Sequence, residues 1–238
     1  MEREDSLLRF FGRGSAFSDE HNSAFFCEGS SLILLDHSLT AFNRLRKTGP
    51  DALTGCKTER IYIIVTHTHS DHICGIPLLV HFSFYVWHIP VTVAVGSDTV
   101  GEDMRYYLDK VEGCDSGAYD IVPAGSLDCV KAVIPTEHTP TLRGKCFGYQ
   151  LEINGRKVVY TGDTRTLLPY LPYLDGETVL YTEISAVDSG VHLFIGDVIE
   201  ILKALTNKGN QVYLMHIDEE KFIKDVISGT SIRLVPLI

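Results

Sequence analysis

The chain has 238 residues, of which 45% are hydrophobic and 22% charged, proportions typical of a globular protein with a sizeable core. Its formal net charge of −10 disfavours binding to extended nucleic acid, because a phosphate backbone attracts a basic surface. The sequence shows neither a signal-type apolar segment nor an apolar run of about 20 residues, so we expect a cytoplasmic protein without a membrane span.

Short runs of β-branched and aromatic residues predict strands along the whole chain. Three such runs come early, and each of the five later ones ends in a histidine or carboxylate side chain that could bind a metal. Largely apolar strands suit a sheet that is covered on both faces. The predicted strands cover residues 6–12, 22–29, 30–36, 60–67, 128–138, 156–163, 177–183 and 210–216.

Four segments have the apolar spacing of amphipathic helices. Ser97 is the expected N-cap of the second helix, and Asp218 is the expected first residue of the fourth. Strands combined with such helices predict a layered α/β fold, whose active site lies on the loops beyond the strand ends. Nothing in the sequence marks a domain boundary, so we expect a single domain over residues 1–238. The helical segments are 37–49, 96–113, 196–209 and 218–229.

The segment THTHSDH places His67, His69, Asp71 and His72 directly after an apolar run. Imidazole and carboxylate groups are the ligand types that suit zinc and similar divalent ions. The tight spacing lets one loop that enters a helix present ligands to two neighbouring ions. With 10 histidines in 238 residues, such a cluster arises by chance in on the order of one chain in a thousand. The segment therefore predicts a metal site.

This motif is followed by His138 in PTEHTP, Asp163 in YTGDT and His216 in YLMH. The set and its order resemble the metallo-β-lactamase-fold superfamily. The resemblance spans essentially the whole chain, and the N-terminal GRGSAFSDEHNSAFFCEGSSLILLD looks like that of the ribonuclease Z-like and phosphodiesterase branch. It implies a four-layer αβ/βα sandwich with two metals at one edge, and a homodimer by family habit.

The resemblance also implies how two divalent ions are held, with zinc the first choice and manganese or iron as alternatives. Such a pair supplies hydroxide at neutral pH and neutralises charge on a phosphoryl or carbonyl oxygen. Asp71 is expected to orient the hydroxide, and Asp36 to hydrogen-bond a ligand histidine. His37 departs from the small residue that is common in the family at that position. The implied ligands are His67, His69 and His138 for the first ion and Asp71, His72 and His216 for the second, with Asp163 bridging the two.

Two features favour phosphodiesters among the substrates of this fold. Glu183 and His192, in YTEISAVDSGVHL, resemble the pair with which the ribonuclease Z-like branch protonates a leaving alkoxide. The alternative is that Glu183 supports a ligand and that His192 begins a helix. The segment FGYQLE…GRKVVYTGDT looks like a strand pair of that branch, and the preceding Arg143 and Lys145 could meet a phosphate or lie in a solvated loop.

We therefore expect a binuclear-metal hydrolase, a phosphodiesterase that acts on a small anionic nucleotide, cyclic nucleotides included. Processing of transfer RNA is disfavoured, because the long basic, glycine-rich arm of ribonuclease Z has no counterpart here. The alternative enzyme is an acyl hydrolase, either a lactonase or a thioesterase, which would use the same metal site without Glu183 and His192. Alternatives of another class are a non-hydrolytic iron redox protein and an inactive binding module.

Overall fold

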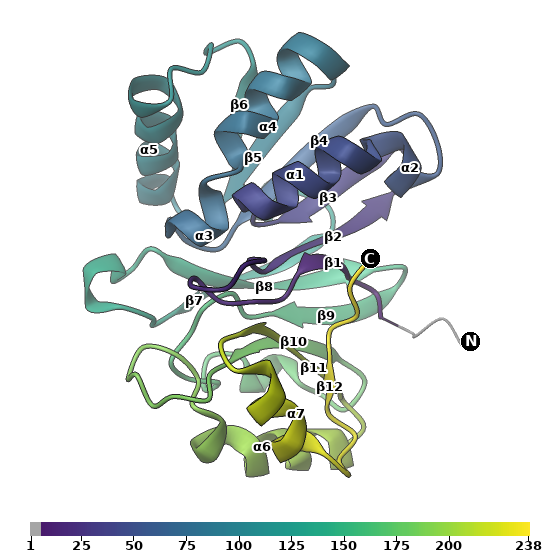
Figure 1. Ribbon diagram of the computed structural model, residues 1–238, viewed down its shortest axis with the longest axis vertical. Coiled ribbons are helices and arrows are strands. Elements are labelled where there is room, and N and C mark those ends of the chain that lie inside the picture. The colour runs from purple at the N-terminus through teal and green to yellow at the C-terminus, as the bar shows by residue number, and fades with distance from the viewer. Residues whose placement is uncertain (1–5) are drawn as a thin grey trace.

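The computed structural model describes residues 6–238, which form two six-stranded sheets packed face to face, with helices on both outer faces (Figure 1). This arrangement confirms the predicted four-layer α/β sandwich. The first sheet contains, in spatial order, β1 (Arg9–Gly12), β2 (Ser23–Glu28), β3 (Ser31–Leu35), β4 (Arg60–Val65), β5 (Val91–Val95) and β6 (Tyr119–Pro123). The second contains β7 (Val130–Thr136), β8 (Cys146–Ile153), β9 (Arg156–Tyr160), β10 (Val179–Ile184), β11 (Gln211–Ile217) and β12 (Arg233–Leu234).

The two sheets have the same pattern of strand directions. In each, the first two pairings are antiparallel and the next three are parallel. Because the carboxyl ends of parallel strands meet at one edge, the loops after β4, β9, β10 and β11 are brought together. The helices are α1 (Leu39–Thr48), α2 (Pro50–Thr54), α3 (Ser70–Ile73), α4 (Ile76–Phe82), α5 (Asp98–Tyr106), α6 (Ile195–Asn207) and α7 (Glu220–Ile227).

Two hydrophobic clusters hold the layers together. The larger one joins the facing sides of the two sheets and includes Phe25, Ile63 and Tyr149. The smaller one lies between the second sheet and its helices and includes Leu202 and Leu214. The strands are therefore covered on both faces, which explains their continuous apolar sequences. We keep one domain over residues 1–238 as a prediction, with residues 1–5 outside the described part.

The helix boundaries agree with the sequence in one case and correct it in another. Ser97 caps α5 through a bond that its hydroxyl accepts from the Val100 amide, and the helix continues as a π-helical turn over Tyr107–Val111. The prediction that the last helix begins at Asp218 is wrong, because α7 begins at Glu220. The Asp218 carboxylate instead accepts hydrogen bonds from the Ser185 hydroxyl and the Ala186 amide, both in the loop after β10. In the described part of the chain, every helix lacks the length and apolarity of a membrane span.

Candidate metal centre

The predicted ligands come from five separate places in the fold and meet at one edge of the sandwich. His67 and His69 follow β4, and the short helix α3 carries Asp71 and His72. The others lie at the ends of strands in the second sheet. All of these side chains are buried except His69, which is half-buried. The remaining members are His138 after β7, Asp163 after β9 and His216 near the end of β11.

One group of ligand atoms is formed by three histidines and an aspartate. Nδ1 of His69 lies 2.9 Å from Nε2 of His67 and 3.3 Å from Nε2 of His138. Oδ2 of Asp163 lies 3.8 Å from the His67 nitrogen and 3.7 Å from the His138 nitrogen. Two ligand atoms that are each about 2.1 Å from a tetrahedral ion lie about 3.4 Å apart. The spacing of this group therefore fits a divalent cation.

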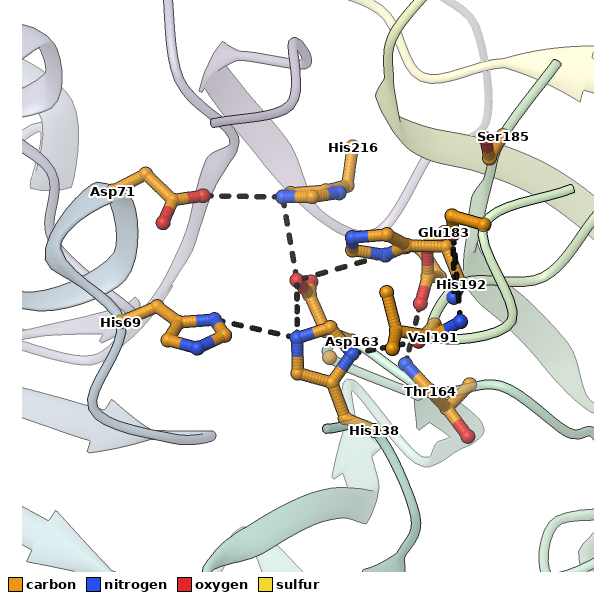
Figure 2. A network of polar contacts seen from close by, with 12 residues as sticks. His69, Asp71, His138, Asp163, Thr164, Glu183, Ser185, Val191, His192 and His216 are labelled. Atoms are coloured by element: carbon orange, nitrogen blue, oxygen red, sulfur yellow. Dashed lines mark hydrogen bonds and ion pairs between the residues drawn. The ribbon is translucent and has the colours of Figure 1, made fainter. Parts of the chain in front are cut away.

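A second group lies on the other side of Asp163 and consists of Asp71, His72 and His216. Oδ2 of Asp71 lies 3.2 Å from Nε2 of His72 and 3.2 Å from Nε2 of His216. The Asp163 carboxylate approaches the same two nitrogens, at 3.3 and 3.5 Å. In Figure 2, His216, His192 and His138 point toward the Asp163 carboxylate from different elements. Asp163 thus stands between two groups of side chains that could each hold a metal ion.

Buried atoms without hydrogen-bond partners support a cation at this point. Nε2 of His72 and Oδ1 of Asp163 are buried, and neither makes a hydrogen bond to another residue within 6–238. Leaving such groups unpaired costs on the order of 1–3 kcal/mol each. A bound cation would satisfy both atoms at once, so the histidine and aspartate clusters fit a divalent metal site.

Asp36 fixes the orientation of His72 in the second group, since it hydrogen-bonds a proposed ligand histidine as the sequence predicts. Its carboxylate accepts hydrogen bonds of 2.8 Å from the Thr66 amide, the Thr66 hydroxyl and Nδ1 of His72. The Thr66 hydroxyl also lies 3.0 Å from Nδ1 of His67. When the His72 imidazole is neutral, as metal binding requires, donation from its Nδ1 to Asp36 leaves the electron pair of Nε2 directed at the metal position.

His138 is oriented in the same way by the loop that precedes α6. Its Nδ1 donates to the Val191 carbonyl oxygen over 2.7 Å, which leaves Nε2 to face the cluster. Val191 neighbours the predicted acid His192, so one loop positions both side chains. No sequence pattern marks Val191, since a backbone carbonyl contributes this bond.

Two of the residues that shape the site have positive φ angles. Asp36 ends β3 at φ 56°, and His216 has φ 50° within β11. The pairing of β10 with β11 shifts register beside His216, because Glu183 pairs with Met215 and Ile184 with Ile217. His216 is therefore the extra residue of a β-bulge, which turns its side chain toward the cluster. Such backbone costs about 1–3 kcal/mol, and it is typical of functional sites.

The electrostatic surroundings give four of the proposed ligands, His67, His69, His138 and Asp71, the protonation states that a cation requires. Burial lowers the pKa of His67 and His69, and it lowers that of His138 to about 4. These imidazoles are therefore neutral at pH 7. Burial alone would raise the pKa of Asp71, but the imidazoles of His216 and His72, each 3.2 Å from its carboxylate, outweigh that effect and hold the pKa well below the usual range. Metal binding needs neutral imidazoles and ionised carboxylates.

Glu183 and His192 lie next to the cluster as a hydrogen-bonded pair. Nδ1 of His192 donates to Oε2 of Glu183 over 2.7 Å and lies 3.9 Å from Oδ2 of Asp163. Glu183 is fully buried and also accepts a bond from the Thr164 amide, whereas the His192 side chain is 24% exposed. Burial lowers the pKa of His192, but the bond and charge of Glu183 outweigh burial and raise it to about 9.

Arg143 and Lys145, for which the sequence leaves open a phosphate contact or a place in a solvated loop, differ in their surroundings. Nζ of Lys145 is 2.6 Å from a carboxylate oxygen of Asp103, so its charge is compensated. Arg143 is exposed and lines a cavity together with His138. Arg165, which was not predicted, lines the same cavity. The basic residue directly after YTGDT is the signal that could have found it.

Comparisons with known proteins identify this architecture. The family model described as "Beta-lactamase superfamily domain" matches residues 33–217. No curated protein matches the sequence. A diphosphatase from the PhnP family has 16% identity and a TM-score of 0.71, covering 97% of this chain and 94% of that chain.

Two further solved structures are similar over most of their length. Zinc-bound PqqB from Methylobacterium extorquens has 11% identity and a TM-score of 0.69, covering 97% of both chains. The short form of human tRNase Z has 17% identity and a TM-score of 0.60, covering 90% of this chain and 93% of that chain. At such identities the similarity shows a shared fold.

Proposed function

The chain belongs to the beta-lactamase superfamily, and we propose that it is a metal-dependent hydrolase whose substrate is a phosphodiester of a small nucleotide. We propose two divalent ions, with zinc as the first choice. Bound there, they would supply an activated water and neutralise charge on the phosphoryl oxygens. The proposed ligands are His67, His69 and His138 for one ion and Asp71, His72 and His216 for the other, with Asp163 shared between them.

Three residues of the chain have proposed roles in the reaction itself. Asp71, whose carboxylate lies beside the second group, holds and orients the attacking water. His192 donates a proton to the leaving oxygen, and Glu183 keeps the imidazole protonated and fixes its orientation. Deeply buried Glu183 has a further bond from the Thr164 amide, so its position is fixed by the strand rather than by the substrate.

The Glu183–His192 pair is the observation that carries the choice of a phosphodiester. An alkoxide is a poor leaving group and needs an acid, and the pKa of about 9 keeps His192 protonated at pH 7. A thioester releases a thiolate, which needs no such acid. A lactone does release an alkoxide, but re-formation of the carbonyl group from a tetrahedral intermediate drives that release, so it depends less on an acid at this position. By their titles, the similar structures include a diphosphatase and a tRNase Z, which supports a substrate that contains phosphate.

The charge of the chain favours a small substrate over a large polyanion. The formal net charge is −10, so an extended nucleic acid would be repelled outside any locally basic region. A mononucleotide or dinucleotide meets mainly the metal centre and its immediate surroundings.

The test compares leaving groups on protein loaded with zinc, manganese or iron. Bis-p-nitrophenyl phosphate releases a phenolate that needs little help from an acid, whereas thymidylyl-thymidine (TpT) releases an alkoxide. We expect both to be hydrolysed, and His192→Ala to lose about 100-fold or more of kcat/KM on TpT while losing far less on the p-nitrophenyl ester. Turnover of a lactone or a thioester alone would refute the phosphodiester. Equal losses on both phosphate substrates would remove the acid role of His192.

A further inference from the structure

A cavity of about 300 Å³ lies beside the metal centre, in the loops that follow β7 and β9. His138 belongs both to the metal-binding cluster and to the wall of this cavity, so the two spaces adjoin. In Figure 1, the loop between β7 and β8 lies on the same side of the molecule as α3, which carries Asp71 and His72. A substrate held at the cluster can therefore extend into the cavity.

Arg143 lies in a tight turn that forms part of the cavity wall. It has φ −55° and ψ 126°, and Gly144 follows with φ +77°. The Lys145 amide donates to the Leu142 carbonyl oxygen over 2.9 Å and closes the turn. These angles define a type II turn, in which the third position requires glycine or asparagine. The backbone of Arg143 is thus held in place, and within residues 6–238 its guanidinium group makes no hydrogen bond or ion pair.

Arg165 supplies a second positive charge to the same cavity. Its amide donates to the Glu137 carbonyl oxygen over 2.8 Å, which fastens the loop after β9 to the loop after β7. Its guanidinium Nε lies 3.3 Å from the Glu137 carboxylate, and both side chains are more than half exposed. An ion pair with that exposure contributes about 0–1 kcal/mol, so an incoming anion can replace Glu137 as the partner of Arg165.

We propose that this cavity binds a second phosphate group of the substrate, through Arg143 and Arg165. The inference rests on the proposed function, which places the scissile phosphate at the metal centre. Guanidinium groups bind phosphate through paired, charge-assisted hydrogen bonds, and two of them flank this cavity in a protein of strongly negative net charge. The substrate class is therefore a phosphodiester that carries an additional phosphate, such as a phosphorylated dinucleotide, rather than a mononucleotide with one phosphate.

A binding experiment tests the cavity without using hydrolysis. Titration calorimetry on zinc-loaded protein would compare thymidine 3′,5′-bisphosphate with thymidine 5′-monophosphate and thymidine 3′-monophosphate. We expect the bisphosphate to bind at least about tenfold more tightly than either monophosphate. The double variant Arg143→Ala/Arg165→Ala should reduce this preference to about threefold or less. The matched control Arg46→Ala, an exposed arginine on α1, should retain the full preference.

Glu137 also lines the cavity, and replacing it should change the preference for the bisphosphate in the opposite direction. Glu137→Gln removes the negative charge that now competes for Arg165, so the preference for the bisphosphate should rise several-fold. Equal binding of all three ligands by the wild-type protein would overturn the inference. A preference that persists in the double variant, or that does not rise in Glu137→Gln, would overturn it as well.

Hydrolysis then separates this inference from the proposed function. The dinucleotides pTpT and TpTp carry the added phosphate on opposite sides of the scissile bond, and we expect one of them to exceed TpT in kcat/KM by about tenfold. Equal rates on all three substrates would overturn the second-phosphate site and leave the phosphodiesterase intact. If none is hydrolysed while the bisphosphate preference is present, the proposed function fails and the phosphate site stands.

Discussion

Replacing Asp36 by asparagine tests how the protein prepares a histidine for the metal. The buried carboxylate accepts bonds from the Thr66 amide, the Thr66 hydroxyl and Nδ1 of His72, each of 2.8 Å. Asparagine has the same shape and tolerates the positive φ of 56° at this position. Its amide oxygen can keep the bond from the Thr66 amide, so its NH₂ group takes the place of Oδ2.

That NH₂ group reverses the hydrogen bond to His72. It can only donate, so Nδ1 of His72 must accept and the imidazole proton moves to Nε2, where the metal would bind. We expect zinc affinity at the site to fall by about 10- to 100-fold, which corresponds to about 1.4–2.8 kcal/mol. Loss of a hydrogen bond to a charged group should lower the free energy of unfolding by about 1.5–3 kcal/mol.

Zinc affinity would be measured by competition with a chromophoric chelator at pH 7, and stability by urea unfolding. Asp51→Asn is the matched control. Asp51 is an exposed residue of helix α2, its carboxylate accepts one hydrogen bond, from the Thr58 amide, and it lies outside the groups that could hold a metal. If Asp36→Asn folds and binds zinc as tightly as the wild-type protein, the reasoning about the His72 proton is wrong.

Three further predictions concern ionisable groups. His192 is protonated below its pKa of about 9, so kcat/KM on TpT should fall as the pH rises through that value, and Glu183→Gln should move this limb to lower pH. Burial lowers the pKa of His37 to about 3, so this side chain gains a proton more readily when the protein unfolds. The free energy of unfolding should therefore decline as the pH falls below about 6.5, by up to about 1.4 kcal/mol per pH unit. Urea unfolding of His37→Leu should show a smaller decline. Bonds from Arg13 lower the pKa of Glu220 to about 2, so Glu220→Gln should cost under about 1 kcal/mol at pH 7 and much less at pH 2, where the carboxyl group is half protonated, as measured by thermal unfolding. An unchanged pH dependence would contradict each of these three predictions.

Most strands that carry ligands could be predicted from their sequences, because each is a short apolar run that ends abruptly in a polar residue. The strands β5 and β6 were not predicted, for two different physical reasons. In the run FSFYVWHIPVTVAV, only the short break at His88 and Pro90 separates a helical turn from Val91–Val95, and periodicity does not separate a buried helix from a buried strand. Tyr119–Pro123 is half-exposed and mixes polar with apolar residues.

Spacing in the sequence could predict only some of the residues of the site. Spacing alone indicated the metal ligands within THTHSDH, because these residues are neighbours in the chain. The link to His138, Asp163 and His216 came from resemblance, since nothing local joins positions so far apart. The bulge that turns His216 inward leaves no trace in QVYLMH, which lacks the glycine that usually marks such a backbone. The approach of Arg165 to Arg143 depends on how two loops pack, which composition does not encode.

The pKa shifts around Asp163, taken with the spacing of the ligand atoms, favour the proposed metal site over a buried salt bridge. Burial lowers the pKa of His67, yet in His72 the charges of Asp163 and Asp36 outweigh burial and raise the pKa well above the usual range. A single proton on His72 compensates part of the negative charge of Asp163, Asp71 and Asp36, but it leaves the neutral lone pairs of the other histidines unused. A divalent cation on each side of Asp163 would compensate the carboxylates and use those lone pairs as well. We therefore propose that the cluster suits cations better than protons, which supports the proposed two-metal centre.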